Sequence, residues 1–116
     1  MYYFLCTIRA ADYKCSAAGK IAVRENNIEL CNRLLMQQRC VAEYALAKKE
    51  YSVCEEFRYD EDALIQKVES ERCYYELAIL AHDPTLCEKI VSPMNRRPDD
   101  DWYRSCKERS AEDSPR

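Results

Sequence analysis

Apolar residues recur along most of this chain at intervals of three or four positions, the spacing that lines one face of an α-helix. Ala18, Ile21 and Ala22 show this spacing near the N-terminus. One glycine and four prolines in 116 residues leave few of the residues that β-turns require. We therefore expect an all-α fold, with helices over residues 2–9, 12–23, 28–35, 37–48, 51–57 and 60–81 and two more that begin at Pro84 and Trp102.

The same pattern indicates where helices begin and end. No glycine or proline separates residues 37–48 from residues 51–57, so one continuous helix over residues 37–58 is an alternative. Aspartate and asparagine cap helix N-termini well, and they precede several predicted helices, as Asn27, Asp60 or Asp62, Asp83 ahead of Pro84, and Asp99 to Asp101. In the helix over residues 60–81 we expect these side chains to face the core: Leu64, Val68, Leu77 and Leu80.

Eight cysteines repeat along the chain with constant spacings, at Cys6, Cys15, Cys31, Cys40, Cys54, Cys73, Cys87 and Cys106. Cys40, Cys73 and Cys106 lie 33 positions apart, as do Cys54 and Cys87. A period of 33 with two helix-sized segments in each unit is typical of helical-repeat arrays. The sequence therefore predicts a short array of antiparallel helical hairpins, with about seven or eight helices in all.

Helix geometry restricts how the cysteines can pair. Within one helix a step of nine residues turns the chain by about 900°, which puts the two side chains on opposite faces. Cys31 and Cys40 can therefore form a disulfide only if the chain turns between them, near Leu35 and Met36. Pairing each cysteine with its neighbour in this way predicts four disulfides that staple the hairpins: Cys6–Cys15, Cys31–Cys40, Cys54–Cys73 and Cys87–Cys106.

Two other pairing schemes remain open. A Cys73–Cys87 disulfide would lie within a hairpin bent at residues 82–84, although the two cysteines stand at unequal distances from that bend. A nested scheme would resemble the twin C-x9-C helical hairpins of the mitochondrial intermembrane space, and would pair Cys6 with Cys40 and Cys15 with Cys31.

Two cysteines are followed, after three residues, by a pair that contains a small or apolar residue. The sequences are Cys40-Val-Ala-Glu-Tyr44-Ala45 and Cys73-Tyr-Tyr-Glu-Leu77-Ala78. Over about residues 30–106 this spacing resembles that of the cysteine-rich tetratricopeptide-like repeat proteins of bacteria. The resemblance implies an extracellular interaction module.

Composition limits the compartment and the partners. The net charge is −3, and basic residues are scattered among acidic ones, so no nucleic-acid partner is expected. No apolar run approaches the roughly 18 residues of a membrane span. Eight cysteines favour an extracellular or periplasmic location. Because the opening Met-Tyr-Tyr-Phe-Leu lacks the features of a signal peptide, the interior of a hyperthermophile or its virus is the alternative.

The sequence offers little catalytic chemistry. The chain has a single histidine and no C-x2-C motif, so we expect no metal site. If all cysteines are paired, none is left as a nucleophile. His82 beside Asp83 is expected to be an exposed helix-end histidine, and the acids at 99–101 are expected to cap a helix rather than bind calcium. We therefore expect no cofactor, no catalytic residue and no enzymatic activity.

Tyrosine is the one suggestive residue type, with nine copies. Tyr44, Tyr74 and Tyr75 are candidate partner-binding residues, because tyrosine is enriched at interfaces, but they can equally fill a thin core. The expected function is a non-catalytic protein-interaction or structural module, which binds a protein partner or itself. The alternative is a carrier with a small apolar ligand between its helices. We expect residues 1–107 to form one domain and residues 108–116 a polar, disordered tail.

Overall fold

The computed structural model describes residues 20–33 and 37–111. Its elements are a helical segment at residues 20–25, the 3-10 helix η1 (Ile28–Arg33), the α-helices α3 (Gln37–Lys48), α4 (Val53–Glu56) and α5 (Ala63–Ala81), the 3-10 helices η2 (Pro84–Lys89) and η3 (Pro93–Asn95), the strands β1 (Arg96–Arg97) and β2 (Asp100–Asp101), and α6 (Trp102–Ser110). The predominantly helical fold is confirmed. Strands β1 and β2 form a small antiparallel hairpin that the sequence pattern did not predict.

The described residues contain fewer α-helices than the seven or eight helices that were expected. They are the helical segment at residues 20–25, α3, α4, α5 and α6. Within the described residues, two expected helices are short 3-10 helices, η1 and η2, and the one expected at residues 51–57 is reduced to the single turn of α4. Short segments adopt 3-10 geometry readily because few residues are available to form α-helical hydrogen bonds.

A left-handed residue separates α3 from α4. Lys49 has a φ of 57°, and the amide of Glu50 donates to the carbonyl of Ala45 at 3.0 Å. This is the hydrogen bond of a Schellman cap, which usually requires glycine or asparagine at the left-handed position. The alternative of one continuous helix over residues 37–58 is therefore wrong. The expected end of this helix at residue 48 is confirmed, although a lysine occupies the left-handed position that glycine usually takes.

Three disulfides hold three hairpins. Each hairpin joins a short helix to a longer one, and the Cα atoms of the bridged cysteines are 5.5 to 5.8 Å apart. The hairpins and their disulfides are η1–α3 with Cys31–Cys40, α4–α5 with Cys54–Cys73, and η2–α6 with Cys87–Cys106.

These disulfides confirm neighbour pairing for six cysteines. The rival Cys73–Cys87 pairing and the nested scheme are wrong, because Cys73, Cys87 and Cys31 each have another partner. The predicted Cys6–Cys15 disulfide lies outside the described residues, as do the turn expected near residues 35–36 and the helix expected at residues 2–9.

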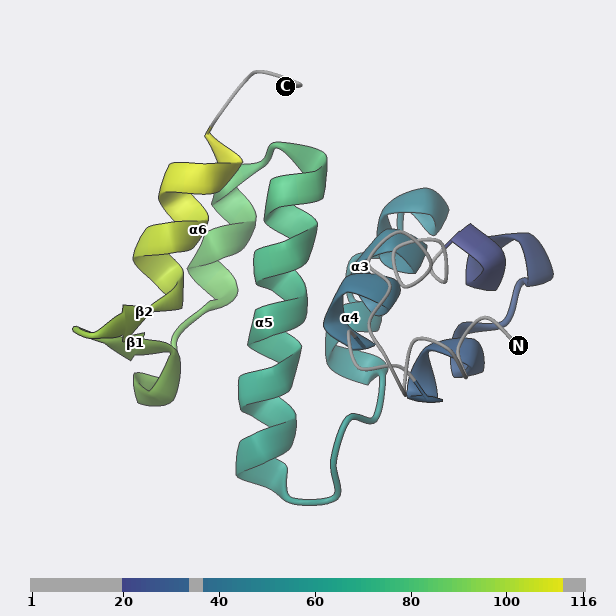
Figure 1. Cartoon of the computed structure of the whole chain (residues 1–116), viewed down its shortest axis with the longest axis horizontal. Coiled ribbons are helices and arrows are strands. Elements are labelled where there is room, and N and C mark those ends of the chain that lie inside the picture. Colours follow the sequence, from purple (N-terminus) through teal and green to yellow (C-terminus); the bar gives the residue numbers. More distant parts are fainter. Residues whose placement is uncertain (1–19, 34–36, 112–116) are drawn as a thin grey trace.

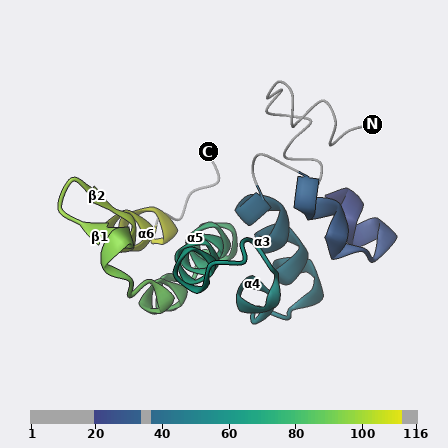
Figure 2. The ribbon, with the colours of Figure 1, turned by 90° about the horizontal axis from the view of Figure 1, so that it is seen from below.

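Helix α5 is the centre of the fold. It lies between α3 and α4 on one side and η2 and α6 on the other (Figures 1 and 2). Cys73 and Leu77 of α5 are buried in a cluster shared with α3 and α4, while Tyr75 and Ala78 are buried in a second cluster shared with η2 and α6. Both faces of this helix therefore bury apolar residues.

The predicted orientation of α5 is correct except at its start. Val68 and Leu77 are buried and Leu80 is half-buried, as expected, but Leu64 is 62% exposed. The first turn of α5 extends past the elements that cover the rest of the helix (Figure 1), which leaves Leu64 in solvent.

Aspartates cap the helices that follow the loops. The carboxylate of Asp62 accepts from the amides of Leu64 and Ile65, and Asp101 caps α6 in the same way. Asp83 caps η2 ahead of Pro84. Asp60 is not the cap of α5; its carboxylate accepts from the amide of Asp62.

The last helix extends into the segment that was expected to be a tail. Helix α6 continues through Ser110, three residues beyond residue 107, where the domain was expected to end. Ser110 is buried, and its hydroxyl donates to the carbonyl of Cys106 at 2.6 Å. The rest of the expected tail, residues 112–116, lies outside the described residues.

Candidate functional site

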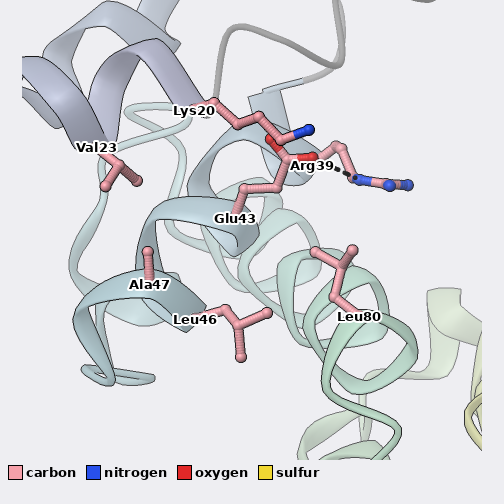
Figure 3. A pocket seen from close by; sticks show the side chains of 7 residues that line it. All are labelled: Lys20, Val23, Arg39, Glu43, Leu46, Ala47 and Leu80. Atoms are coloured by element: carbon pink, nitrogen blue, oxygen red, sulfur yellow. Dashed lines mark hydrogen bonds and ion pairs between the residues drawn. The ribbon is translucent and has the colours of Figure 1, made fainter.

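One stripe of α3 remains partly uncovered. Arg39, Glu43, Leu46 and Ala47 stand at positions i, i+4, i+7 and i+8, which share one face of a helix. With Lys20 and Val23 from the helical segment at residues 20–25, and Leu80 from the end of α5, they line a hollow of about 410 Å³. We call this hollow the α3 groove (Figure 3).

The floor of the α3 groove is aliphatic. Val23, Leu46 and Ala47 lie around it, and Leu80 approaches from α5 (Figure 3). Leu46 and Leu80 are half-buried and pack against the core cluster shared by α3, α4 and α5, whereas Ala47 is exposed. The floor therefore opens to solvent and offers aliphatic surface supported by a packed core.

The charged residues lie together at one end of the groove (Figure 3). The guanidinium of Arg39 donates to Glu43 at 3.2 Å and to Glu76 at 3.4 Å. Burial raises the pKa of both carboxyls above the usual value, and the charge of Arg39 opposes that shift. Arg39 thus has its charge compensated from within the fold.

Two polar atoms at this end, Oε1 of Glu43 and Nζ of Lys20, form no hydrogen bond or ion pair with the described part of the chain. The Oε1 atom of Glu43 is buried and has no hydrogen-bond partner there. The exposed Lys20 forms no ion pair within 4 Å with any described residue. The charge of Lys20 also opposes the rise in the pKa of Glu43. The rim of the groove therefore carries an exposed ammonium that acts on Glu43 but is not held in an ion pair.

The tyrosines singled out from the sequence lie elsewhere. Tyr74 is 3% exposed and Tyr75 is 7% exposed, so both are core residues. The hydroxyl of Tyr75 lies 3.0 Å from that of Ser105, and its ring meets Trp102 edge-on with centroids 4.8 Å apart. These two side chains cannot form an exposed partner-binding face.

Tyr44 is half-buried and packs against the core cluster that contains α3. The ammonium of Lys48 lies 5.6 Å from the centre of its ring. Tyr44 does not line the α3 groove. The sequence pattern did not predict this groove. The only available signal was the spacing of Arg39, Glu43 and Leu46, because the groove also depends on how residues 20–25 and α5 approach α3.

A second hollow, of about 240 Å³, lies where α4, α5 and η2 meet. Its lining is rich in charged residues, and the described chain pairs them: Lys67 with Glu71 at 3.4 Å and Glu55 with Lys89 at 3.8 Å. This hollow therefore lacks both an aliphatic floor and an unsatisfied group that would select a ligand.

Glu71, at the edge of this second hollow, has a structural role. It is 2% exposed, and its carboxylate accepts from the amide of Ser92 at 3.0 Å, the Ser92 hydroxyl at 2.7 Å and the Asn95 side chain at 3.0 Å. Burial alone would raise the pKa of Glu71, but these hydrogen bonds and the nearby Lys67 charge lower it below the usual value. Glu71 fixes the loop after η2 onto α5.

The described residues do not suggest metal chemistry. Among them, no three His, Cys, Asp or Glu side chains gather where they could hold a metal ion, and all six of their cysteines form disulfides. In the same part of the chain no helix is long and apolar enough to cross a membrane.

The α3 groove, with its aliphatic floor and charged rim, can bind an apolar group beside a polar one.

Comparison of the chain with models of known protein families, with curated proteins and with solved structures finds no match.

Proposed function

We propose that this chain is a non-catalytic protein-interaction module that receives an aliphatic side chain of its partner in the α3 groove. The observation that supports this most is the combination of an open hollow of about 410 Å³, an aliphatic floor and a charged rim. Binding sites are commonly concave and apolar with a few polar groups that fix orientation. Leu46 and Leu80 supply the floor, and Lys20 supplies the polar group.

The disulfides support this proposal because they hold the walls of the groove. Cys31–Cys40 fastens α3 to η1, and Cys54–Cys73 fastens α5 to α4. A groove fixed before binding loses less conformational entropy when it is occupied. Three disulfides in so small a chain are consistent with an oxidising compartment, and we propose an extracellular or periplasmic location.

We also propose that the three hairpins form a short helical-repeat array, as the resemblance to tetratricopeptide-like proteins implies. Two side-chain pairs support this, since they are related by the 33-residue period. Tyr74 donates to Glu55 at 2.5 Å, and Lys107 donates to Glu88 at 2.9 Å. In both hairpins the glutamate that follows the first cysteine accepts a hydrogen bond from the residue that follows the second cysteine.

The second candidate function is the carriage of a small apolar ligand. The volume of the α3 groove favours it, because ligand cavities usually measure about 300 to 1,000 Å³. The exposure of Ala47 and Lys20 argues against it, because a carried ligand would remain partly in water.

Titration with N-acetyl-leucine N-methylamide, followed by methyl NMR of the oxidised protein, tests the proposal. A side chain that enters the groove will shift the methyl signals of Val23, Leu46, Ala47 and Leu80 at millimolar concentration, as expected for so small a probe. Ala47→Glu should abolish the shifts of the remaining methyls, those of Val23, Leu46 and Leu80, and the matched control Ala111→Glu should preserve all four. Shifts spread evenly over the surface, or none, would reject the groove as a binding site.

Decanol distinguishes the carrier from the interaction module. A carrier should take up one molecule of decanol with micromolar affinity and protect it from water. The interaction module should bind decanol with no greater free energy per non-hydrogen atom than it binds the leucine probe. Stoichiometric, micromolar decanol binding would favour the carrier.

A further inference from the structure

The first turn of α5 carries an exposed aliphatic pair. Leu64 is 62% exposed and Ile65 is 43% exposed, among the highest values for large apolar side chains in the described residues. Their amides are capped by Asp62, so the turn that presents them is well formed. We call Glu61, Leu64 and Ile65 the α5 tip.

The α5 tip and the α3 groove lie at opposite ends of the same helix. The tip is at the start of α5, and Leu80, a wall of the groove, is in its last turn (Figure 1). From Leu64 to Leu80 the helix rises by about 24 Å. A rigid element therefore separates the two surfaces, and one molecule cannot bring its own tip into its own groove.

The two surfaces are complementary in shape and charge. The tip projects two aliphatic side chains, and the groove offers an open aliphatic floor that one such side chain can occupy. Lys20 at the rim forms no ion pair with the described residues, and neither does the exposed Glu61 of the tip. A tip seated in a groove can bring these opposite charges together.

We propose that the partner of the α3 groove is the α5 tip of a second copy of this chain. The proposal rests on the proposed function of the groove and names its occupant. Because tip and groove are different surfaces, the contact is heterologous, and each added copy leaves a free tip and a free groove. The copies associate head to tail along α5 into an open-ended assembly. The contact is small, so we expect weak association.

Sedimentation velocity tests this with variants that leave the core untouched. The oxidised protein should grow in mean mass between about 10 μM and about 1 mM. Leu64→Asp removes the tip and Ala47→Glu blocks the groove, and each variant alone should stay monomeric. An equimolar mixture should form dimers and nothing larger, because it retains one functional tip and one functional groove per pair. Val91→Asp, at a 52% exposed residue elsewhere, is the matched control and should assemble like the parent.

Charge reversal gives a second readout. Lys20→Glu and Glu61→Lys should each weaken assembly, because each puts like charges at the contact. A mixture of the two variants should restore assembly, because the groove of one variant then meets a tip of opposite charge on the other. Unchanged thermal melting of each variant shows that it is folded.

The two proposals fail in different ways. If the parent protein stays monomeric at 1 mM while the leucine probe still shifts the groove methyls, self-association is overturned and the groove remains a docking site. If the probe also fails, both proposals are overturned. If the parent assembles but the mixture of tip and groove variants does not, the head-to-tail contact is overturned.

Discussion

Lys49 and His82 stand 33 positions apart and end their helices in the same way. Their φ angles are 57° and 52°. In each case the amide of the next residue donates to the carbonyl five positions before it, from Glu50 to Ala45 at 3.0 Å and from Asp83 to Ala78 at 2.9 Å. A new hairpin begins after each of these caps, so the caps set the boundaries between hairpins.

Lys49→Gly should therefore stabilise the protein. Glycine adopts the left-handed conformation without the steric cost that lysine carries there, and we expect a gain of about 0.5 to 1 kcal/mol in the free energy of unfolding. Urea denaturation measures it. The neighbouring Lys48→Gly is the control and should cost about 1 kcal/mol, because residue 48 is still helical. Equal effects from the two variants would show that the cap does not constrain residue 49.

Glu71→Gln should destabilise the protein. The carboxylate is 2% exposed and accepts hydrogen bonds from Ser92 and Asn95. Glutamine retains the volume, but it loses the charge and offers a donor where an acceptor is needed, so we expect a loss of about 2 to 3 kcal/mol. The exposed Glu50→Gln is the matched control and should change stability by less than about 0.5 kcal/mol. Similar losses from both variants would contradict the role of Glu71 as the anchor of this loop.

The same residue predicts an acid-sensitive stability. The folded protein lowers the pKa of Glu71, so its contribution is complete above the pKa of the unfolded chain and is lost as pH falls through the lower, folded value. Stability should fall more steeply in the parent than in Glu71→Gln as the pH drops below about 4.5. Urea denaturation between neutral pH and pH 3 measures both slopes. Parallel slopes would mean that this carboxyl is not specifically stabilised in its ionised form.

Two of the disulfides, Cys54–Cys73 and Cys87–Cys106, should contribute equally to the stability of the fold but unequally to binding in the α3 groove. Cys54–Cys73 and Cys87–Cys106 both span 19 residues, so replacing either pair by alanine should cost about 3 kcal/mol. Of these two disulfides, only Cys54–Cys73 fastens a wall of the α3 groove. Its loss should weaken binding of the leucine probe, whereas loss of Cys87–Cys106 should leave that binding unchanged. Equal losses of binding would show that the groove depends on the whole fold.

The sequence predicted the features that depend on local chemistry. The cysteine spacing predicted all three disulfides of the described residues, and the positions of Asp62, Asp83 and Asp101 predicted three helix starts. The break between residues 48 and 51 was expected, although no glycine or proline marks it. A lysine, Lys49, adopts the left-handed conformation that ends α3, so the residue type itself gives no signal of the break.

The α3 groove could not be predicted from the sequence, because it depends on how separate elements pack. From the helical period, both Leu64 and Leu80 were expected to face the core. Which of these positions is covered depends on where neighbouring elements end. The first turn of α5, which carries the exposed Leu64, extends past its neighbours (Figure 1), and Ala47 on α3 is exposed. Pattern alone cannot supply such tertiary information.

The most direct test of the proposed docking role is methyl NMR of the oxidised protein titrated with N-acetyl-leucine N-methylamide. We predict saturable shifts confined to Val23, Leu46, Ala47 and Leu80, absent in Ala47→Glu and retained in Ala111→Glu. Shifts of equal size at Val91 and Met94, which are exposed but lie outside the groove, would contradict it.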